Sequence, residues 1–284
     1  MKDILERRAA IVRGIRSFFD DLGFVEVETA VRIPAPAPEE HIDCPPVVDG
    51  GYLRASPELQ MKKLLALGMD RIYQIGPCFR EGERGSRHNP EFSMIEWYRK
   101  GATYLDIMED LKALFASLSH NAEPFKLLRV REAYRKYAGW DPWIAWEQDR
   151  FDFDMATKIE PAIKELGGGV FLTDYPTQAA SLAKISSPTS GSQDSYAERW
   201  EFYYDGMELA NCFTELCDEA EQHRRFLAAK AARKELGESD YPIDEEFLFC
   251  LPQIGSAAGV ALGVDRLIMV LTGTKEISAV RANI

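Results

Sequence analysis

The chain has 284 residues, which is enough for one large domain or two small ones. Its apolar fraction of 46% supports a hydrophobic core, and its formal net charge of −12 disfavours a surface that grips a nucleic-acid backbone. Five cysteines without a CxxC spacing indicate reduced thiols in a cytoplasmic protein, not a disulfide framework or a zinc site. The charged N-terminus does not resemble a signal peptide, and no apolar run approaches the length of a membrane span.

The first half of the chain begins with an amphipathic pattern. The predicted elements are a helix over 4–22, a strand over 24–28, a proline-rich loop over 33–46, a helix over 56–67, and strands over 71–76 and 91–99. Gly23 is expected to end the first helix. Ser56 is expected to cap the second helix, with Pro57 in its first turn and Gly68 at its end.

The second half mixes helical and extended patterns. The predicted elements are a mostly helical region over 104–166, a turn and strand over 167–176, a low-complexity loop over 186–195, a hairpin over 200–216 that turns at Asp205-Gly206, a charged helix over 217–237, and a strand running into a helix over 259–271. Because strands and helices do not alternate regularly, we predict an α+β fold with an antiparallel β-sheet flanked by helices. No internal repeat or linker is found, so we expect a single domain over 1–284.

A strand rich in charges and rings spans residues 91–99, just after a turn that carries Arg80 and Arg84. Alternate residues of a strand share a face. One face of this strand would carry Phe92, Met94, Glu96 and Tyr98. That row makes a poor core, and it suits a pocket wall that stacks a flat ring at one end and pairs a cation at the other. The competing interpretation is an exposed hairpin with surface ion pairs.

The hairpin over 200–216 carries further carboxylates at Glu201, Glu208 and Glu215. Asn211, Phe213 and Glu215 share one strand face, and Glu208 joins them only through a β-bulge or at a strand end. Carboxylates beside arginines suggest Mg²⁺ bridging phosphate oxygens, with solvated edge carboxylates as the alternative.

The third stretch, GVALGVDRLIMVL, is glycine-rich and places Arg266 in the first turn of a helix, where phosphate is favoured. Neither GxGxxG nor GxxxxGK[ST] occurs in the chain, so a nucleotide would be bound by another route.

These stretches together resemble the three signature motifs of class II aminoacyl-tRNA synthetases. GFVEVETA with its preceding helix resembles motif 1, FREGERGSRHNPEFSMIEWY resembles motif 2, and GVALGVDR resembles motif 3. SPEL and ELANCFTEL make the resemblance closest to the lysyl branch. The resemblance implies the class II catalytic domain, which forms a homodimer through motif 1.

The motifs begin almost at Met1, so we expect no N-terminal OB-fold of the kind that binds the anticodon in lysyl-tRNA synthetases. In this the chain resembles the GenX family of stand-alone paralogues, which ligate (R)-β-lysine onto a lysine of translation elongation factor P. The resemblance implies an ATP-dependent ligase that activates (R)-β-lysine or lysine as its adenylate, with ATP and Mg²⁺ as cofactors. The resemblance also implies elongation factor P as the protein substrate in place of tRNA, and the acidic charge fits a protein acceptor at least as well as a tRNA.

The resemblance also implies residue roles. The implied sets are catalytic Arg80 and Arg266; ATP-binding Arg80, Glu83, His88, Asn89, Phe92 and Arg266; Mg²⁺-binding Glu201 and Glu208; and substrate-binding Ser56, Glu58, Glu96, Tyr98, Asn211, Phe213, Glu215, Ala261 and Gly263. Within these sets Phe92 would stack on adenine, while Glu96, Tyr98 and Glu215 would surround the distal ammonium of the amino acid.

Four positions depart from the lysyl pattern. Ala30 stands where motif 1 usually has proline, and Gly82 where motif 2 usually has glutamate. Cys212 replaces a glycine and would narrow the pocket, or would be a small buried thiol without chemistry. Ala261 replaces a motif 3 glycine, as in the paralogue family, and its methyl group would favour a β-amino acid.

Three other functions are open. One is a minimal lysyl-tRNA synthetase, one is an inactive paralogue that binds a regulatory ligand or partner, and one is a nucleic-acid-binding module. The retention of Arg80, Phe92, Glu201, Glu208 and Arg266 argues against the inactive paralogue, and the negative charge argues against the binding module.

Overall fold

The computed structural model describes residues 2–119, 124–187 and 194–282. Contacts between Cα atoms divide the chain into two compact units. The first comprises Met1–Gly101, Cys217–Ala257 and Ala261–Ile284, and the second comprises Ala102–Leu216 with Ala258–Val260. Both combine helices with mostly antiparallel strands, so the predicted α+β class is confirmed. Most of the loop expected over 186–195 lies outside the described residues.

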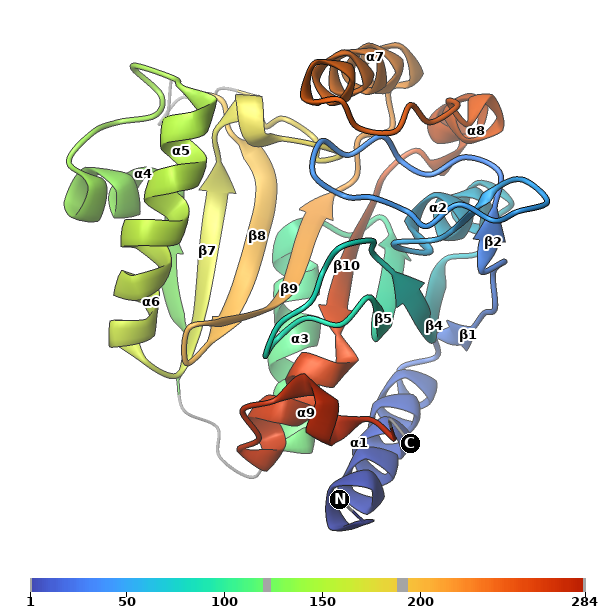
Figure 1. Ribbon diagram of the computed structural model, residues 1–284, viewed down its shortest axis with the longest axis vertical. Helices are drawn as coiled ribbons and strands as arrows, with labels where there is room; N and C mark the ends of the chain where they lie inside the picture. Colours follow the sequence, from blue (N-terminus) through green and yellow to red (C-terminus); the bar gives the residue numbers. More distant parts are fainter. Residues whose placement is uncertain (1, 120–123, 188–193, 283–284) are drawn as a thin grey trace. The chain divides into compact units, whose positions relative to one another are not determined.

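The first unit contains the N-terminal and C-terminal parts of the chain (Figure 1). Its elements are α1 (Lys2–Asp21), β1 (Val25–Glu26), β2 (Arg32–Ile33), β3 (Tyr52–Leu53), α2 (Glu58–Ala66), β4 (Arg71–Phe79), β5 (Glu91–Lys100), α7 (Glu219–Leu236), α8 (Glu245–Ile254), β10 (Ala257–Gly263), α9 (Val264–Thr272) and the 3₁₀ segment η4 (Ile277–Val280). The strand order is β1-β4-β5-β10, with β1 parallel to β4 and β4 antiparallel to β5. β2 and β3 form a separate antiparallel ribbon.

The core of this unit forms where α1 covers β4 and β5. Ile15 and Phe19 are fully buried on the helix face that the apolar spacing predicted. The Phe19 ring stacks on Tyr73 of β4 at 4.9 Å and lies 5.1 Å from Trp97 of β5. Trp97 belongs to the odd-numbered face of β5, which packs against α1, and the even-numbered side chains point to the opposite side of the strand. α9 follows directly from β10 and lies beside α1 (Figure 1).

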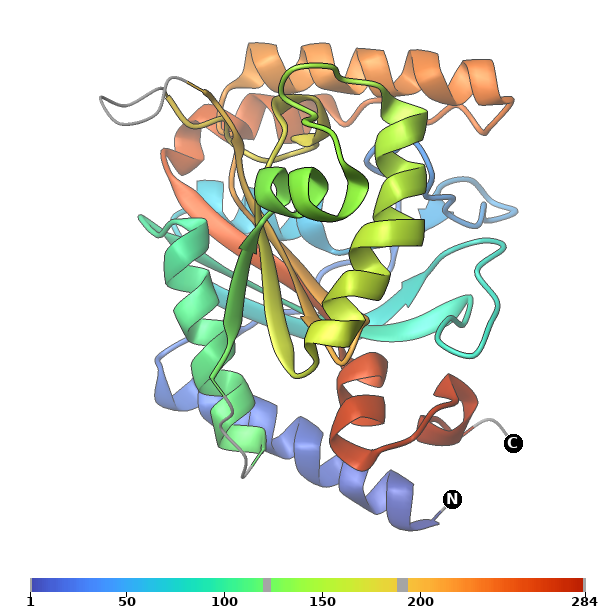
Figure 2. The same ribbon diagram turned by 90° about the vertical axis from the view of Figure 1, so that its left-hand side faces the viewer.

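The second unit is built on four strands in the order β9-β8-β7-β6. Its elements are α3 (Tyr104–Leu118), β6 (Lys126–Arg129), α4 (Val130–Ala133), the π-helical turn η1 (Tyr134–Ala138), α5 (Gln148–Asp154), the π-helical turn η2 (Met155–Ile159), α6 (Glu160–Leu166), β7 (Gly169–Tyr175), the 3₁₀ turn η3 (Thr177–Ala179), β8 (Ala197–Tyr204) and β9 (Met207–Thr214). Figure 2 shows α3 and the continuous α5–η2–α6 rod on the two sides of these strands.

Several elements were not predicted, among them β6 and α8. β6 interrupts the region 104–166, which is otherwise helical as expected, because its short run pairs in parallel with β7. α8 was missed because an internal proline, Pro252, and a dense apolar run hide its period. Within the described ranges, no helix combines the length and apolarity that crossing a bilayer requires.

The hairpin prediction is confirmed, including its turn. β8 and β9 are antiparallel and are joined by Asp205 and Gly206, whose φ angles are 47° and 74°. Two consecutive positive φ values define the type I′ turn that Asp-Gly favours between strands. The Asp205 side chain accepts a hydrogen bond from the N–H of Gly168 at 2.7 Å, which ties the turn to the start of β7.

Candidate active site

The even-numbered face of β5 carries a buried carboxylate, Glu96. Its side chain is 1% exposed and accepts two hydrogen bonds, from the Ser56 hydroxyl at 2.5 Å and from the Tyr98 hydroxyl at 2.8 Å. Burial, followed by the nearby Glu58 carboxylate, raises the pKa of Glu96 to about 7. These two hydrogen bonds come from neutral hydroxyls, so the carboxyl group is suited to a cationic ligand, which would favour its ionised form.

Ser56 and Glu58 meet at the start of α2. Pro57 occupies the N-cap position, so the prediction of Ser56 as the cap is wrong by one residue. The Ser56 hydroxyl nevertheless accepts the N–H of Glu58 at 2.9 Å while it donates to Glu96. Glu58 is paired at 2.5 Å with Lys62, whose side chain is 1% exposed. A hollow adjoins this corner, lined by Ser56 and Glu58 together with residues of the proline-rich segment such as Ala37.

At the other end of the same β5 face, an arginine lies over an aromatic ring. The Arg80 guanidinium carbon is 5.2 Å from the centre of the Phe92 ring, and Arg80 Nη1 lies 3.5 Å from a carboxylate oxygen of Glu83. Among the described residues, the buried Nε of Arg80 has no hydrogen-bond partner. Buried donors are normally satisfied, so this arginine is suited to an anionic ligand.

Arg266, in the first turn of α9, lies against the loop before β5. Its Nη2 is 2.7 Å from Nε2 of His88, and its Nε donates to the carbonyl of Arg87 at 3.3 Å. Burial and then the Arg266 charge lower the pKa of His88, so its ring is neutral near pH 7. Because arginine can only donate, His88 Nε2 is the acceptor. Asn89 closes the loop by donating to the carbonyl of Glu91 at 2.5 Å.

In the second unit, the odd-numbered face of β8 carries a charged network around Glu201. Its two oxygens accept from Arg199 at 2.7 Å and from the Tyr203 hydroxyl at 2.6 Å. Arg199 also donates through Nε to the side-chain oxygen of Asn211 on β9 at 3.0 Å. Burial and then the Glu201 charge raise the pKa of Tyr203, so its hydroxyl stays protonated and continues to donate.

The β-bulge that Glu208 requires is present. The β8–β9 register shifts between Phe202 and Tyr203, so that Tyr203 is opposite Glu208 while Glu201 is opposite Asn211. The shift moves Glu208 onto the face of Glu201 and Asn211, as the sequence pattern demanded. In the described parts of the chain, no group of three or more His, Cys, Asp or Glu side chains is arranged to hold a metal ion.

The remaining predicted residues are distributed over both units. Phe213 and Glu215 of the second unit are buried, and Phe213 is opposite Arg199 in the strand register. Ala261 and Gly263 belong to the end of β10 in the first unit and are half-buried. A Cβ at Gly263 would meet the Arg266 side chain at 3.8 Å, which is an ordinary contact.

Two of the departures from the lysyl pattern have a structural explanation. Gly82 adopts a φ of 77°, which a side chain rarely accepts, so the turn of motif 2 itself requires glycine. Cys212 is fully buried and its thiol points to the carbonyl of Tyr104 in α3, away from the face of Asn211. Of the two alternatives for Cys212, a narrowed pocket or a small buried thiol, the structure supports the buried thiol. Burial raises the pKa of this thiol well above the usual value.

Sequence reasoning missed several charged residues that hold this arrangement. Arg54 is 1% exposed and donates to Thr29 and to the carbonyls of Ala30 and Pro77. It anchors the segment where motif 1 usually ends in proline. Lys62 and Arg199 could have been found from the pattern, because Lys62 follows Glu58 by one helical turn and Arg199 shares the strand face of Glu201. Arg54 gave no such signal.

Comparison with known proteins identifies the class to which this fold belongs. A family profile described as "tRNA synthetases class II (D, K and N)" matches residues 1–282, and the chain belongs to this family. It is 37% identical to the elongation factor P–(R)-β-lysine ligase of Proteus mirabilis, over 98% of this chain and 94% of that protein. The proteins of the same name from Vibrio cholerae and Histophilus somni strain 2336 are 36% and 35% identical, over 98% and 96% of this chain and 94% and 92% of theirs. The family resemblance inferred from the motifs is confirmed.

Proposed function

We propose that this protein is an ATP-dependent ligase that activates (R)-β-lysine, or lysine, as its adenylate and transfers the acyl group to a lysine of elongation factor P. The observation that carries the proposal is the even-numbered face of β5, with Arg80 over Phe92 at one end and buried Glu96 at the other. One strand thus offers an anion site beside a ring and a cation site. The names of the relatives support elongation factor P as the acceptor.

In the first step, a carboxylate oxygen of the amino acid attacks the α-phosphorus of ATP. A new P–O bond forms, the bond to the bridging oxygen breaks, and pyrophosphate leaves. Negative charge builds on the phosphoryl oxygens as this happens. Arg80, whose buried Nε has no hydrogen-bond partner in the described part of the chain, would stabilise that charge, and such preorganised donors contribute strongly to catalysis. Phe92 would carry the adenine ring, with Arg266 and His88 beside the nucleotide.

The amino acid would be oriented by its amines. The distal ammonium would displace the proton of Glu96 and donate hydrogen bonds to its carboxylate beside Tyr98, while the amine nearer the carboxyl group would approach Glu58. Lys62 already pairs with Glu58, so the ionised carboxylate of Glu96 would be the group that balances the distal ammonium. This arrangement favours a diamino acid over a neutral one.

Mg²⁺ fits the residues of the second unit. Glu201 and Glu208 share one strand face after the bulge and would hold the ion that accompanies ATP. Mg²⁺ commonly uses one or two carboxylates together with phosphate oxygens and water, so a larger protein cluster is not needed. The ion would neutralise phosphate charge, and Arg199 and Tyr203 would keep Glu201 oriented.

In the second step, the acceptor lysine attacks the acyl carbon of the adenylate. A new amide bond forms, the bond to phosphate oxygen breaks, and AMP leaves with the electron pair. The attacking amine must be deprotonated, so its proton passes to solvent or to a nearby base. We further propose that the enzyme acts in the cytoplasm, where translation takes place, and as a homodimer through its motif 1 segment. We also propose that residues 1–284 act as a single catalytic domain.

The test is amino-acid-dependent exchange between ATP and pyrophosphate, with (R)-β-lysine, (S)-α-lysine and the other standard amino acids. Purified elongation factor P is then added, and its intact mass is measured for the gain of one lysyl group. Arg80→Ala is the matched control, which should lose both signals. Exchange followed by acylation of tRNA, with unmodified elongation factor P, would establish the minimal synthetase. No exchange with any amino acid would refute the ligase and favour the inactive paralogue.

A further inference from the structure

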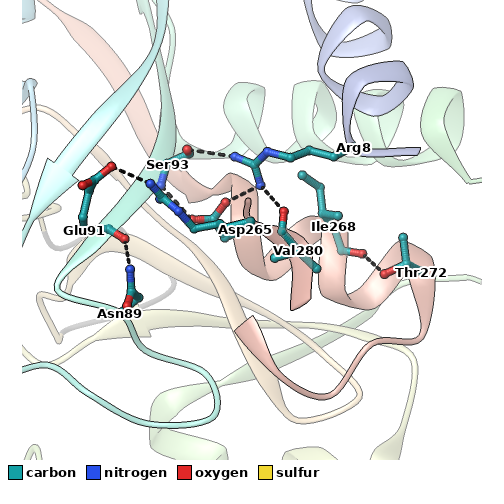
Figure 3. Close-up of polar contacts among 9 residues, drawn as sticks. Arg8, Asn89, Glu91, Ser93, Asp265, Ile268, Thr272 and Val280 are labelled. Atoms are coloured by element: carbon teal, nitrogen blue, oxygen red, sulfur yellow. Dashed lines mark hydrogen bonds and ion pairs between the residues drawn. The ribbon is translucent and has the colours of Figure 1, made fainter. Parts of the chain in front are cut away.

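A buried carboxylate lies one residue before Arg266. Asp265 is 1% exposed, and its oxygens accept from three separate segments of the first unit. Arg8 of α1 donates to Oδ1 at 2.5 Å, while the N–H of Ser93 in β5 donates to Oδ2 at 2.8 Å. Figure 3 shows Arg8 reaching between Asp265, the Ser93 side chain and the carbonyl of Val280. Such a carboxylate fixes the segments that donate to it.

The third donor is Arg281, which follows η4. Its Nη1 reaches Asp265 Oδ2 at 3.2 Å, and its Nη2 reaches a carboxylate oxygen of Glu91 at 2.5 Å. The planar guanidinium therefore bridges the start of α9 and the start of β5, a geometry that a single ammonium cannot reproduce. The same C-terminal segment is also tied to the motif 2 loop, where Ile277 N–H donates to the carbonyl of Ser86 at 2.8 Å.

The residues that this bridge holds are sequence neighbours of Phe92 and Arg266, which belong to the proposed nucleotide site. Glu91 and Ser93 are the immediate neighbours of Phe92, and both are held by this cluster. Asp265 is the immediate neighbour of Arg266, so the same carboxylate fixes the helix start from which that arginine extends. A shift of either segment would move Phe92 relative to Arg266.

The members of the cluster differ in what they do for the fold. Asp265 is almost fully buried, so its loss would remove the carboxylate that Arg8 and Arg281 share and destabilise the protein. The Arg281 and Glu91 side chains are 17% and 51% exposed, and an ion pair at that depth contributes little to stability. The Arg281–Glu91 pair therefore contributes more to the relative position of β5 and α9 than to the free energy of unfolding.

We propose that Arg281 is a positioning residue for nucleotide binding, which holds β5 and α9 in register through Glu91 and Asp265. This inference rests on the proposed function, since it assigns ATP to Phe92 and Arg266. Arg281 touches no reacting atom. Its removal would leave the catalytic groups present and their spacing loose, so ATP affinity would fall while the amino-acid site on the same strand stays intact.

The experiment compares Arg281→Ala, Arg281→Lys, Glu91→Ala and the double alanine variant with the unmodified enzyme. ATP binding is measured by calorimetry, and KM for ATP, KM for the amino acid and kcat are measured by pyrophosphate exchange. We expect Arg281→Ala to raise Kd and KM for ATP about tenfold, with KM for the amino acid and the melting temperature nearly unchanged. Arg281→Lys should recover part of the loss, and the double variant should be no worse than Arg281→Ala.

Arg224→Ala is the matched control, because it removes an exposed Arg–Glu pair on α7 outside this cluster. Should Arg281→Ala fail to fold, Glu91→Gln tests the same bridge with a smaller change. Unchanged ATP affinity in the Arg281 and Glu91 variants overturns the positioning role and leaves the ligase standing. Equal losses for ATP and the amino acid, in step with the melting temperature, also overturn it. An unmodified protein that binds no ATP refutes both this inference and the proposed function.

Discussion

Proton release on substrate binding offers a sharp test of the amine site around Glu96. The pKa of this carboxyl is raised from 4.5 to about 7, mainly by burial, so the free enzyme holds a proton there below neutral pH. A substrate ammonium would stabilise the ionised carboxylate and expel that proton. The amine itself is charged across this range, because a lysine side chain titrates near 10.4.

The magnitude follows from the titration of one site. With a pKa of about 7, Glu96 is about 0.9 protonated at pH 6 and about 0.1 protonated at pH 8. Binding should therefore release about 0.9 proton at pH 6 and about 0.1 at pH 8. The affinity for the amino acid should fall about tenfold for each pH unit below 7.

The same shift has a consequence for stability with a definite sign. The pKa of Glu96 is higher in the folded than in the unfolded state, so the stability that its protonated form contributes is fully present below pH 4.5. As the pH rises from 4.5 through 7, this contribution to the free energy of unfolding is lost, by about 3 kcal/mol.

The assay is calorimetry of (R)-β-lysine binding at pH 6 and pH 8 in buffers of different ionisation enthalpy. The buffer dependence of the measured heat gives the number of protons released. Glu96→Gln is the control, since it keeps the shape and cannot titrate; we expect weaker binding and no release. Equal heats in all buffers at pH 6, or the same release from Glu96→Gln, would show that the amine does not pair with this carboxylate.

Three further predictions concern other parts of the molecule. Arg80→Ala should lower kcat for pyrophosphate exchange by about 100-fold or more, because a preorganised donor to the phosphoryl group is lost; a change below tenfold would contradict this. Gly206→Ala should lower the free energy of unfolding by more than about 2 kcal/mol, since φ is 74° and the new Cβ would lie 2.5 Å from Lys164 Cβ. In denaturant titrations Gly237→Ala, with a φ of 78° and open space, should cost only about 1 kcal/mol. Cys212→Ala should lower the melting temperature without changing the preference between β-lysine and α-lysine, and an altered preference would contradict the placement of its thiol.

Much of the local structure could be predicted from the pattern of residues. The period-2 alternation of 91–99 assigned Trp97 to one face and Glu96 to the other, and the structure confirms both. Asp205-Gly206 specified the hairpin turn because few other pairs accept two positive φ angles. The parity mismatch of Glu208 required a bulge or a strand end, and the structure has the bulge. These are short-range rules, so neighbouring residues contain the information they need.

The sequence by itself therefore determined the α+β class, the motif-bearing strands and the chemical types that face one another along each strand. Only the tertiary structure decided which distant charges meet. Asp265 joins Arg281 to Arg8 and Ser93, which lie 257 and 172 residues away from it in the sequence, and no local period encodes such contacts. The raised pKa of Glu96 also depends on burial beneath α2 and on the approach of Glu58. Desolvation and Coulomb interaction act through space, so they take values only once the chain has folded.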